Sequence, residues 1–326
     1  MTKAYAGGVI ASPPRRQWRV SPAFAWVAVA PFILWTAGRL TGVDQRPVIV
    51  EFITLTPYVA AASLGAVLIA LASRSRAVIA VSAATSTLLA AMVLPRALPS
   101  APTATGPTLK ILTSNMFFGS ADPKTIVDLV RRLKPDILST QELTPAAVEA
   151  LDAAGLEESL PYTLNQAAFG AYGSGIWSRY PLTPMPDFAL QGSRNMPRAR
   201  VAVPGGPPVE IVDVHTISPV GRDVYEWRAD MASLPAPSSD VIRILAGDFN
   251  ASLDHSPLRD VLARGYADAG DATGTGLHPT WPADWRIPPM ITIDHVLYDK
   301  RASAVTTSVH TVPGTDHRAL FAELRL

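Results

Sequence analysis

Leu245-Ala246-Gly247-Asp248-Phe249-Asn250 closes an apolar run that follows Asp240 and has the length and composition of a buried strand. In an extended chain the side chains of residues i and i+2 point to the same face. Asp248 and Asn250 therefore project together from the end of this predicted strand, as a carboxylate and a carboxamide that could hold a metal ion or a water molecule. A turn after a strand explains the same residues, because Asp, Asn and Gly are common turn formers. The rest of the chain decides between the two interpretations.

The chain divides into two parts of opposite charge. Its 326 residues leave room for one large domain or two smaller ones. Residues 1–100 carry nine Lys and Arg against two acids, a net charge of +7, whereas residues 101–326 carry nineteen against twenty-five, a net charge of −6. Only 17% of all residues are charged, which is unusual for a protein that is soluble throughout. Cysteine is absent, which excludes disulfide and thiolate chemistry.

Three apolar runs without charged residues fill most of the first hundred positions, at residues 20–38, 52–73 and 77–95. Each is close to the roughly 20 residues that an α-helix needs to cross a bilayer. Buried helices of a soluble protein are the alternative, but three such runs in series with almost no polar face favour membrane helices. A cleavable signal peptide fits poorly, because the first run lacks a small-x-small cleavage site and two more runs follow. We predict a three-helix membrane domain at residues 20–95.

The basic residues that flank these runs predict their orientation. Six lie on one side of the predicted membrane and three on the other: Lys3, Arg15, Arg16, Arg19, Arg74 and Arg76 against Arg39, Arg46 and Arg96. The more basic side of a membrane protein is usually cytoplasmic. Residues 1–19 are therefore expected to form a cytoplasmic tail, and everything after the third run is expected to lie outside the cell membrane.

The rest of the chain is expected to form a separate domain. Residues 96–108 are rich in Pro and lack periodicity, which is typical of a semi-extended linker. Residues 109–326 alternate short apolar runs with amphipathic segments, and the apolar runs end in polar residues. Helices are expected at residues 123–133, 146–154 and 223–234, and strands at residues 109–115, 137–142, 175–178, 198–203, 209–215, 241–246, 293–297 and 318–324. This pattern predicts an α/β fold of two packed sheets flanked by helices.

Polar side chains recur where the predicted strands end or begin: Asn115, Glu142, His215, Asp248, Asn250, Asp294, Asp316 and His317. A hard divalent cation prefers carboxylate and carbonyl oxygens. Hydrolysis of a phosphate ester requires an activated water, a charge clamp for the phosphoryl oxygens and an acid for the leaving oxygen. Each residue alone could be a cap, a buried histidine or a loop residue. The ordered set favours phosphoester hydrolysis.

With this ordered set of residues, the sequence resembles the endonuclease/exonuclease/phosphatase superfamily, whose fold is that of deoxyribonuclease I. The matching motifs are Thr-Ser-Asn115, Gln141-Glu142, Val214-His215, Gly247-Asp248-Phe-Asn250, Ile293-Asp294-His-Val and Gly-Thr-Asp316-His317-Arg-Ala. The resemblance covers residues 109–326. It implies a four-layer α/β/β/α sandwich and a phosphoesterase that depends on Mg²⁺ or Mn²⁺.

The resemblance also assigns the metal site and the attacking water. It implies that Glu142 is the principal metal ligand, that Asn115 lies beside it and that Asp316 lies near the metal. It further implies that Asp248 activates or orients the water and that Asn250 positions it.

Further roles concern the phosphate. The resemblance implies that His317 acts as acid or base against the phosphate, oriented by Asp294, and that His215 donates to the phosphoryl oxygens. Arg198 and Arg200 follow the run Asn195-Met-Pro. They are candidates for phosphate binding, although arginines on an edge strand are often only solvated.

Five other aromatic or imidazole side chains match no motif. We expect His255, His278 and His310 at the surface. Trp281 and Trp285 either line the mouth of a cleft or fill space inside the fold.

The identity of the phosphoester stays open at this stage. Three membrane helices would hold the site near lipid at high effective concentration, and the layout is similar to membrane-anchored bacterial members of the superfamily associated with teicoplanin tolerance. That similarity implies a lipid-linked substrate such as undecaprenyl pyrophosphate. A membrane-tethered extracellular nuclease is the alternative, although the net charge of −6 makes nucleic acid an unlikely partner. A phospholipase or sphingomyelinase-type activity stays possible, and a catalytically inactive scaffold is disfavoured because no motif residue is missing. No protein partner is inferable.

Overall fold

The strand that ends in Asp248 lies inside a six-stranded sheet of the computed structural model, which describes residues 20–186, 194–283 and 287–326. The predicted tail, residues 1–19, and Trp285 lie outside the described residues. The order of this sheet is β5 (Leu182–Pro184), β6 (Arg198–Val201), β7 (Val209–His215), β8 (Ile242–Asp248), β10 (Asp294–Asp299) and β9 (Tyr266–Asp268). The second sheet runs β11 (Ser303–Thr311), β12 (Arg318–Arg325), β1 (Thr108–Asn115), β2 (Ile137–Gln141), β4 (Ser174–Ser178) and β3 (Tyr162–Gln166).

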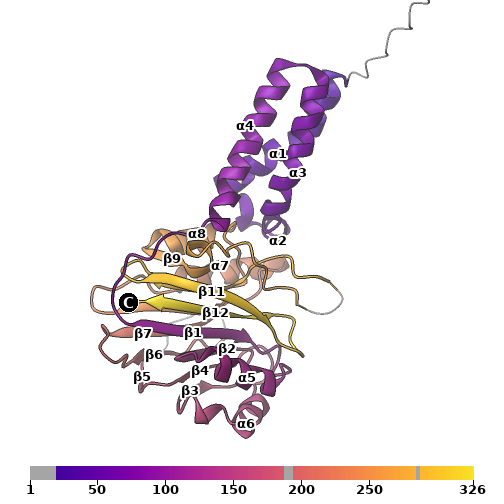
Figure 1. Cartoon of the computed structure of the whole chain (residues 1–326). Coiled ribbons are helices and arrows are strands. Elements are labelled where there is room, and N and C mark those ends of the chain that lie inside the picture. Colours follow the sequence, from indigo (N-terminus) through magenta and orange to yellow (C-terminus); the bar gives the residue numbers. More distant parts are fainter. Residues whose placement is uncertain (1–19, 187–193, 284–286) are drawn as a thin grey trace, which may run out of the picture.

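The two sheets pack face to face and helices cover their outer faces (Figure 1). Between the sheets lies an apolar core that includes Ile111, Ile176, Ile244 and Val296. Helices α5 (Pro123–Leu133) and α6 (Pro145–Ala153) cover the sheet that contains β1, and α7 (Val224–Ser233) and α8 (Ser256–Ala263) cover the sheet that contains β8. The predicted four-layer α/β/β/α sandwich is confirmed.

Helix α5 shows how the sequence specifies one of these layers. The Asp122 side chain accepts a hydrogen bond from the Thr125 amide, and Pro123 occupies the first turn, where its missing N–H removes no bond. Ile126 and Val130, one turn apart, are buried against the sheet. Full burial of such a side chain contributes about 1.5–3 kcal/mol, so this stripe holds the helix on the sheet.

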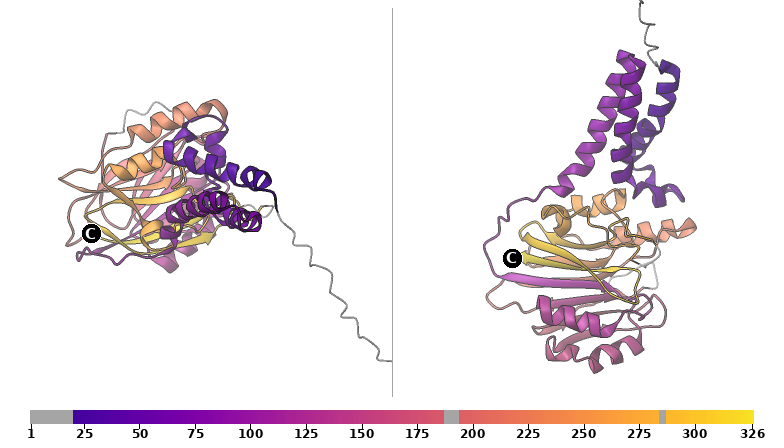
Figure 2. Two further views of the ribbon diagram at one scale, coloured as in Figure 1. Left: turned by 90° about the horizontal axis from the view of Figure 1, so that it is seen from above. Right: turned by 45° about the vertical axis from the view of Figure 1, so that its right-hand side comes forward.

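The described residues before the sandwich form a helical bundle, from Pro22 to Ala97, that stands on the sandwich (Figures 1 and 2). Its long helices are α1 (Pro22–Thr41), α3 (Thr56–Ser73) and α4 (Arg76–Val93), the last extended by a 3-10 turn, η2 (Leu94–Ala97). These three segments are long and apolar enough to cross a membrane. The second predicted run starts differently from expectation, because its first residues belong to a separate short helix, α2 (Ile49–Ile53). The new helix starts at α3 because Pro57 lies in its first turn, where the missing N–H of proline favours a helix start.

A set of buried polar contacts holds the bundle on the sandwich. Both Arg39, in α1, and Arg96, in η2, form ion pairs with Asp254, at 2.9 and 2.6 Å. The Ser256 amide donates to the Asp44 carboxylate at 2.5 Å, and His255 Nε2 donates to the Val50 carbonyl at 2.8 Å. We call residues 254–256 the docking segment.

The prediction that His255 lies at the surface is therefore wrong. Its ring is buried against α2, and its Nδ1 accepts a hydrogen bond from the Ser252 amide. His278 is exposed and His310 is half-buried.

The remaining short elements connect these parts. They are η1 (Val43–Gln45), η3 (Leu156–Glu158), η4 (Gly221–Asp223) and α9 (Ala269–Ala272). Residues 99–107, which belong to the predicted linker, run along the sandwich, and Pro99 forms an isolated bridge with Thr273.

Candidate active site

Strand direction brings the polar strand ends to one edge of the sandwich. β1 and β2 are parallel, as are β7 and β8, so Asn115, Glu142, His215 and Asp248 follow carboxyl ends that lie together. β10 runs antiparallel to β8 with Asp294 opposite Asp248, and β12 runs antiparallel to β1 just after His317. The two strands that begin at this edge thus add a carboxylate and an imidazole to the four strand ends.

Gly247 permits the close approach of β7 and β8 next to the site. A Cβ atom at this position would lie 2.0 Å from the Val214 carbonyl oxygen, and the glycine adopts a φ of +151°. Any side chain here would push the strands apart. The glycine of the Gly-Asp-Phe-Asn motif is therefore required by the geometry that places Asp248.

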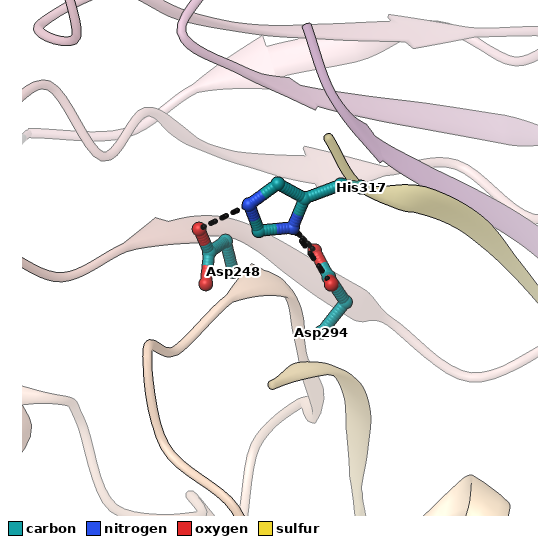
Figure 3. Close-up of side chains that lie close together, drawn as sticks. All are labelled: Asp248, Asp294 and His317. Atoms are coloured by element: carbon teal, nitrogen blue, oxygen red, sulfur yellow. Dashed lines mark hydrogen bonds and ion pairs between the residues drawn. The ribbon is translucent and has the colours of Figure 1, made fainter. Parts of the chain in front are cut away.

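His317 lies between two carboxylates (Figure 3). Its Nδ1 donates to Asp294 Oδ2 at 2.9 Å, and its Nε2 faces Asp248 Oδ2 at 3.7 Å. Burial opposes a charge on this imidazole, but the negative charges of Asp294 and Asp248 outweigh burial and raise the pKa of His317 to about 10. The Thr315 hydroxyl donates to the Asn115 carbonyl and accepts from the His317 amide, which ties the Gly-Thr-Asp-His motif to the end of β1.

Asp248 and Glu142 are joined by Asn115. The Asn115 amide nitrogen lies 3.0 Å from Asp248 Oδ2 and 3.3 Å from Glu142 Oε1. Burial and the nearby charge of Asp294 raise the pKa of Asp248 to about 7, against the lowering effect of His317. Asp248 Oδ1 accepts a hydrogen bond from the Asn250 amide at 2.8 Å. This bond forms the turn that the sequence allowed as the alternative, because Asn250, with a φ of +46°, is not in extended chain. The two side chains still lie together, with Asn250 Nδ2 3.3 Å from Asp248 Oδ2.

Strained backbone surrounds these groups. Phe117, Phe118, Glu142 and Asn250 are non-glycine residues with φ between +45° and +54°. Such conformations cost of order 1–3 kcal/mol each and cluster where a site fixes the direction of a side chain. The Phe118 amide donates to Glu142 Oε2 at 2.9 Å, which fixes that carboxylate with Oε1 toward Asn115.

His215 and Arg194 form a second pair at the same edge. Arg194 Nη1 lies 2.5 Å from His215 Nε2. The same Nη1 lies 3.2 Å from His215 Nδ1, so the guanidinium lies against the imidazole ring, and the donor role implied for His215 stays a prediction. Burial and the positive charges of Arg194 and His317 lower the pKa of His215 well below its usual value. The cationic donor at this position is Arg194, which the sequence-based reasoning missed although it precedes the Asn195-Met-Pro run.

Arg198 and Arg200 are not brought to the site. Arg198 pairs with Glu210 at 3.3 Å and donates to the Pro186 carbonyl. Its register partner in β7 is Val212, three residues and thus about 10 Å before His215. Arg200, opposite Glu210, lies further away and is exposed. Both point away because their positions in β6 alternate with the core residues Ala199 and Val201.

His295, next to Asp294, supports the chain that follows Asp248. Its Nδ1 donates to Asp268 at 2.8 Å and its Nε2 donates to the Ala251 carbonyl at 2.8 Å. Burial opposes the charged form, but Asp268 raises the pKa of this imidazole above its usual value. His295 therefore holds the segment 249–251 through a charged, fully hydrogen-bonded ring.

The donor set fits a divalent cation. Atoms of Asp248, Asp294 and His317 lie within 4.8 Å of one another and could hold a metal ion. Both Asp294 oxygens already face His317 Nδ1, so a cation here would draw on Glu142 and Asp316, which line the same cavity. Asp316 Oδ1 is buried and has no hydrogen-bond partner among the described residues. A buried carboxylate oxygen without a donor is what a cation would satisfy.

These groups line a cavity of about 370 Å³. Its polar side includes Glu142, Arg194, Asp248, Asn250, Asp316 and His317. Trp281 lines it too and donates its indole N–H to Asp316 Oδ2 at 3.1 Å, which answers the question left open by the sequence in favour of the cleft. Val50 and Glu51 of α2, and Thr54 just after it, also line this cavity, which no pattern in the sequence predicted.

Residues 112–317 match the model of the Endonuclease/Exonuclease/phosphatase family. The chain belongs to this family. Its members are hydrolases that act on phosphate esters. The matched range begins in β1 and ends at His317, so it contains the whole polar edge.

Solved structures of the same fold agree. An endonuclease/exonuclease/phosphatase from Beutenbergia cavernae is 20% identical over 67% of this chain and 72% of its own, with a TM-score of 0.52. D. rerio TDP2 complexed with a single-strand DNA product is 17% identical over 67% and 99%, with a TM-score of 0.53. An AP endonuclease from Archaeoglobus fulgidus is 14% identical over 66% and 98%, with a TM-score of 0.54. A comparison with curated proteins gave no match. At these identities the likeness shows the fold alone.

Proposed function

We propose that this protein is a membrane-anchored, metal-dependent phosphoesterase that hydrolyses a phosphate or pyrophosphate ester of a lipid, with undecaprenyl pyrophosphate as the best candidate. The observation that carries the proposal is the arrangement of His317 and Asp294 opposite Asp248, beside Glu142, in a cavity that the apolar bundle also lines. The apolar helices account for the lipid, and the polar edge accounts for the phosphoester chemistry.

Each of the site residues has a separate role in the hydrolysis. Asp248, whose pKa of about 7 lies near neutral pH, accepts a proton from the attacking water while Asn250 holds that water. His317, whose pKa of about 10 keeps it protonated at neutral pH, donates to the phosphate and then to the leaving oxygen. Asp294 fixes its tautomer and stabilises its charge. Arg194 provides the positive charge for the phosphoryl oxygens.

Glu142 and Asp316 would hold a Mg²⁺ or Mn²⁺ ion, with Asn115 beside them, and the Asn115 amide orients the carboxylates of Glu142 and Asp248. Such an ion polarises a phosphoryl oxygen and neutralises negative charge. In a pyrophosphate ester the P–O bond to the terminal phosphoryl group breaks, water supplies the new oxygen, and the lipid monophosphate leaves with the proton from His317.

Tethering and charge support a lipid substrate. Three apolar helices would keep the cavity near the bilayer, where the local concentration of lipid is high. The chain from residue 101 onward carries a net charge of −6, whereas binding of a nucleic-acid backbone normally uses a basic surface. A membrane-tethered nuclease is the second candidate, because two of the similar structures are an AP endonuclease and a TDP2 bound to DNA.

Phosphate release tests the assignment. The full chain, purified in detergent, is given polyprenyl pyrophosphate, phospholipids including sphingomyelin, and DNA, each with Mg²⁺ and with excess chelator. We expect metal-dependent release from polyprenyl pyrophosphate and none from DNA. Cleavage of DNA alone would establish the nuclease, and cleavage of phospholipid alone would establish a phospholipase-type enzyme.

We further propose that the N-terminus is cytoplasmic and that the sandwich lies outside the cell membrane, on the basis of the six-to-three asymmetry of basic residues. A phosphatase reporter fused after Leu326 is then active, and a reporter that works only in the cytoplasm is inactive at the same position. The reverse result would refute this orientation.

A further inference from the structure

The cavity has an apolar wall that the phosphate chemistry does not use. Val220 and Ile291 of the sandwich loops form the accessible part of this wall. Val50 in α2, whose side chain is buried, and Thr54, just after α2, lie on the side of the bundle. The hydrolytic groups Glu142, Asp248 and His317 line the same cavity, so a molecule that fills it contacts polar groups at one side and hydrocarbon at the other.

Helix α2 is fixed on the sandwich rather than being a free connection between α1 and α3. His255 Nε2 donates to the Val50 carbonyl at 2.8 Å, and the Tyr58 hydroxyl, one turn into α3, donates to the Met290 carbonyl at 2.8 Å. The buried pairs of Arg39 and Arg96 with Asp254 hold the adjoining helix ends. The apolar wall is therefore a built part of the site.

The surface around α2 is apolar as well. Phe52 in α2 is 54% exposed, Val220 is 59% exposed, and Ile49 and Met290 are also exposed. α2 lies at the base of the bundle, on the side of the sandwich that carries α7 and α8 (Figures 1 and 2). Two of the helices apolar enough to cross a membrane, α1 and α3, flank it directly in the chain. Exposed apolar side chains therefore lie in α2 and in the loops that line the cavity, close in the chain to those helices.

The charge beside this wall argues against a nucleic-acid strand. Glu51 of α2 is exposed and lines the cavity, and Arg194 is the one arginine among the described residues that line it. A polyphosphate strand running along α2 would place its charges against Glu51, which is repulsive. A hydrocarbon chain carries no charge and is not repelled by Glu51.

We infer that the apolar wall formed by Val220 and Ile291, with α2 packed behind it, receives the hydrocarbon chain next to the phosphorylated head of an amphiphilic substrate. The inference rests on the proposed lipid phosphoesterase function and adds a residue-level account of chain specificity. The first two or three isoprenoid or acyl units beyond the phosphate lie along this wall, and the rest of the chain stays in the membrane.

Chain-length dependence tests the inference. The full chain in lipid nanodiscs is assayed with a long-chain polyprenyl pyrophosphate and with a short-chain, water-soluble one. In Val220→Asp, we expect the ratio of kcat/KM for the long chain to that for the short chain to fall at least about tenfold, mainly through KM. Tenfold corresponds to about 1.4 kcal/mol, which is what burial of roughly two methylene groups contributes. Val305→Asp, at an exposed valine of β11 that is not among the described residues lining the cavity, leaves the ratio unchanged.

A second measurement does not depend on turnover. Because the chain has no cysteine, Val220→Cys and Val305→Cys each introduce a single thiol. We expect a methylene-bridged, non-hydrolysable long-chain analogue to protect the thiol at 220 from a water-soluble maleimide, and a short-chain analogue to protect it less. The thiol at 305 is protected by neither.

The outcomes separate the inference from the proposed function. If wild-type protein hydrolyses the long-chain lipid while Val220→Asp keeps its ratio and the thiol at 220 is not protected, the apolar wall does not bind the chain although the function holds. If wild-type protein cleaves only DNA, both the function and the inference are overturned.

Discussion

The bundle and the sandwich bury opposite kinds of side chain. In the sandwich the largest buried residues are Trp177, Trp227, Tyr266 and Phe249, and each helix layer covers its sheet with Leu, Ile and Val. In the bundle the inward positions are largely small, including Ala25, Ser63, Ala66, Ala70 and Ser82, while Leu34 is 72% and Leu64 63% exposed. A water-soluble core is stabilised by burial of large apolar surface, whereas helices in lipid pack through small residues.

This difference is what we expect if the bundle lies in a membrane and the sandwich lies in water. The bundle places its large side chains where lipid would contact them, and it joins its helices by close approach and by bonds such as the one from the Trp35 indole to Thr56 at 3.1 Å. The sandwich places its chemistry at one edge. The docking segment, residues 254–256, connects the bundle to the sandwich. The following substitutions test how far the two regions depend on each other.

The largest expected effect lies wholly in the sandwich. Glu142→Gln removes a carboxylate that the Phe118 amide and Asn115 orient toward the cavity. We expect turnover to fall to the level found in excess chelator, because loss of the ion removes more transition-state stabilisation than loss of one acid–base group. Phosphate release with Mg²⁺ and with excess chelator measures it.

The exposed Glu149→Gln in α6 is the matched control and should behave as wild type. Full activity of wild-type protein in excess chelator would refute both the metal and the role of Glu142.

The next effect concerns His317 and Asp294, which act as a pair. General acid–base assistance is worth about 10²–10⁴-fold, so His317→Ala is expected to cost that much and Asp294→Asn somewhat less. Because Asp294 acts through His317, at 2.9 Å, the double variant should be little slower than His317→Ala alone. A double-mutant cycle on phosphate release, with circular dichroism to check folding, measures the coupling. Fully multiplicative losses would mean that the two residues act independently.

A smaller effect on turnover and a larger one on stability are expected at the boundary of the two regions. Burial alone would raise the pKa of Asp254, but the hydrogen bonds and charges of Arg96 and Arg39 hold it below its usual value. Asp254→Asn leaves two buried guanidinium groups without their anion, a loss of about 3–5 kcal/mol in comparable buried pairs. We expect faster proteolysis around residues 42–55 and slower hydrolysis of membrane-borne substrate.

The control breaks an exposed ion pair instead. Glu158→Gln removes the partner of Arg131, and such surface pairs contribute about 0–1 kcal/mol. Equal proteolysis of Asp254→Asn and Glu158→Gln would show that the docking segment does not hold the bundle.

The smallest effect is a shift in pH dependence. The His317 cation is stabilised by Asp294, and its acid form is lost as the pH rises through its pKa of about 10. Asp294→Asn removes the charge that raises this pKa, so the alkaline limb of the rate profile should move to lower pH, toward the ordinary value of about 6.5. The pH dependence of kcat/KM checks this, with the exposed Asp128→Asn as control. An alkaline limb that stays in place would remove Asp294 from the role of charge partner.

The sequence alone determined the features that depend on local pattern. The strand that ends in Asp248, the helix that starts at Pro123 and the three apolar runs follow from periodicity, capping and length, which are properties of neighbouring residues. The order of the motifs determined the family, and with it the sandwich. The strands β3 and β11 were not predicted, because β3 is half exposed and β11 is rich in Thr and Ser, so neither shows an apolar pattern.

Only the tertiary structure decided which distant residues meet. Arg39 and Asp254 are 215 positions apart, and Val50 and His255 are 205 apart, so no local signal links them. Arg194 rather than Arg198 lies at the site because the loop before β6 reaches His215, whereas the strand positions face Glu210. The placement of α2 in the wall of the cavity is of the same kind. Local patterns determine which segments form helices and strands. Contacts between segments depend on how the segments pack, and such contacts join the apolar bundle to the catalytic edge.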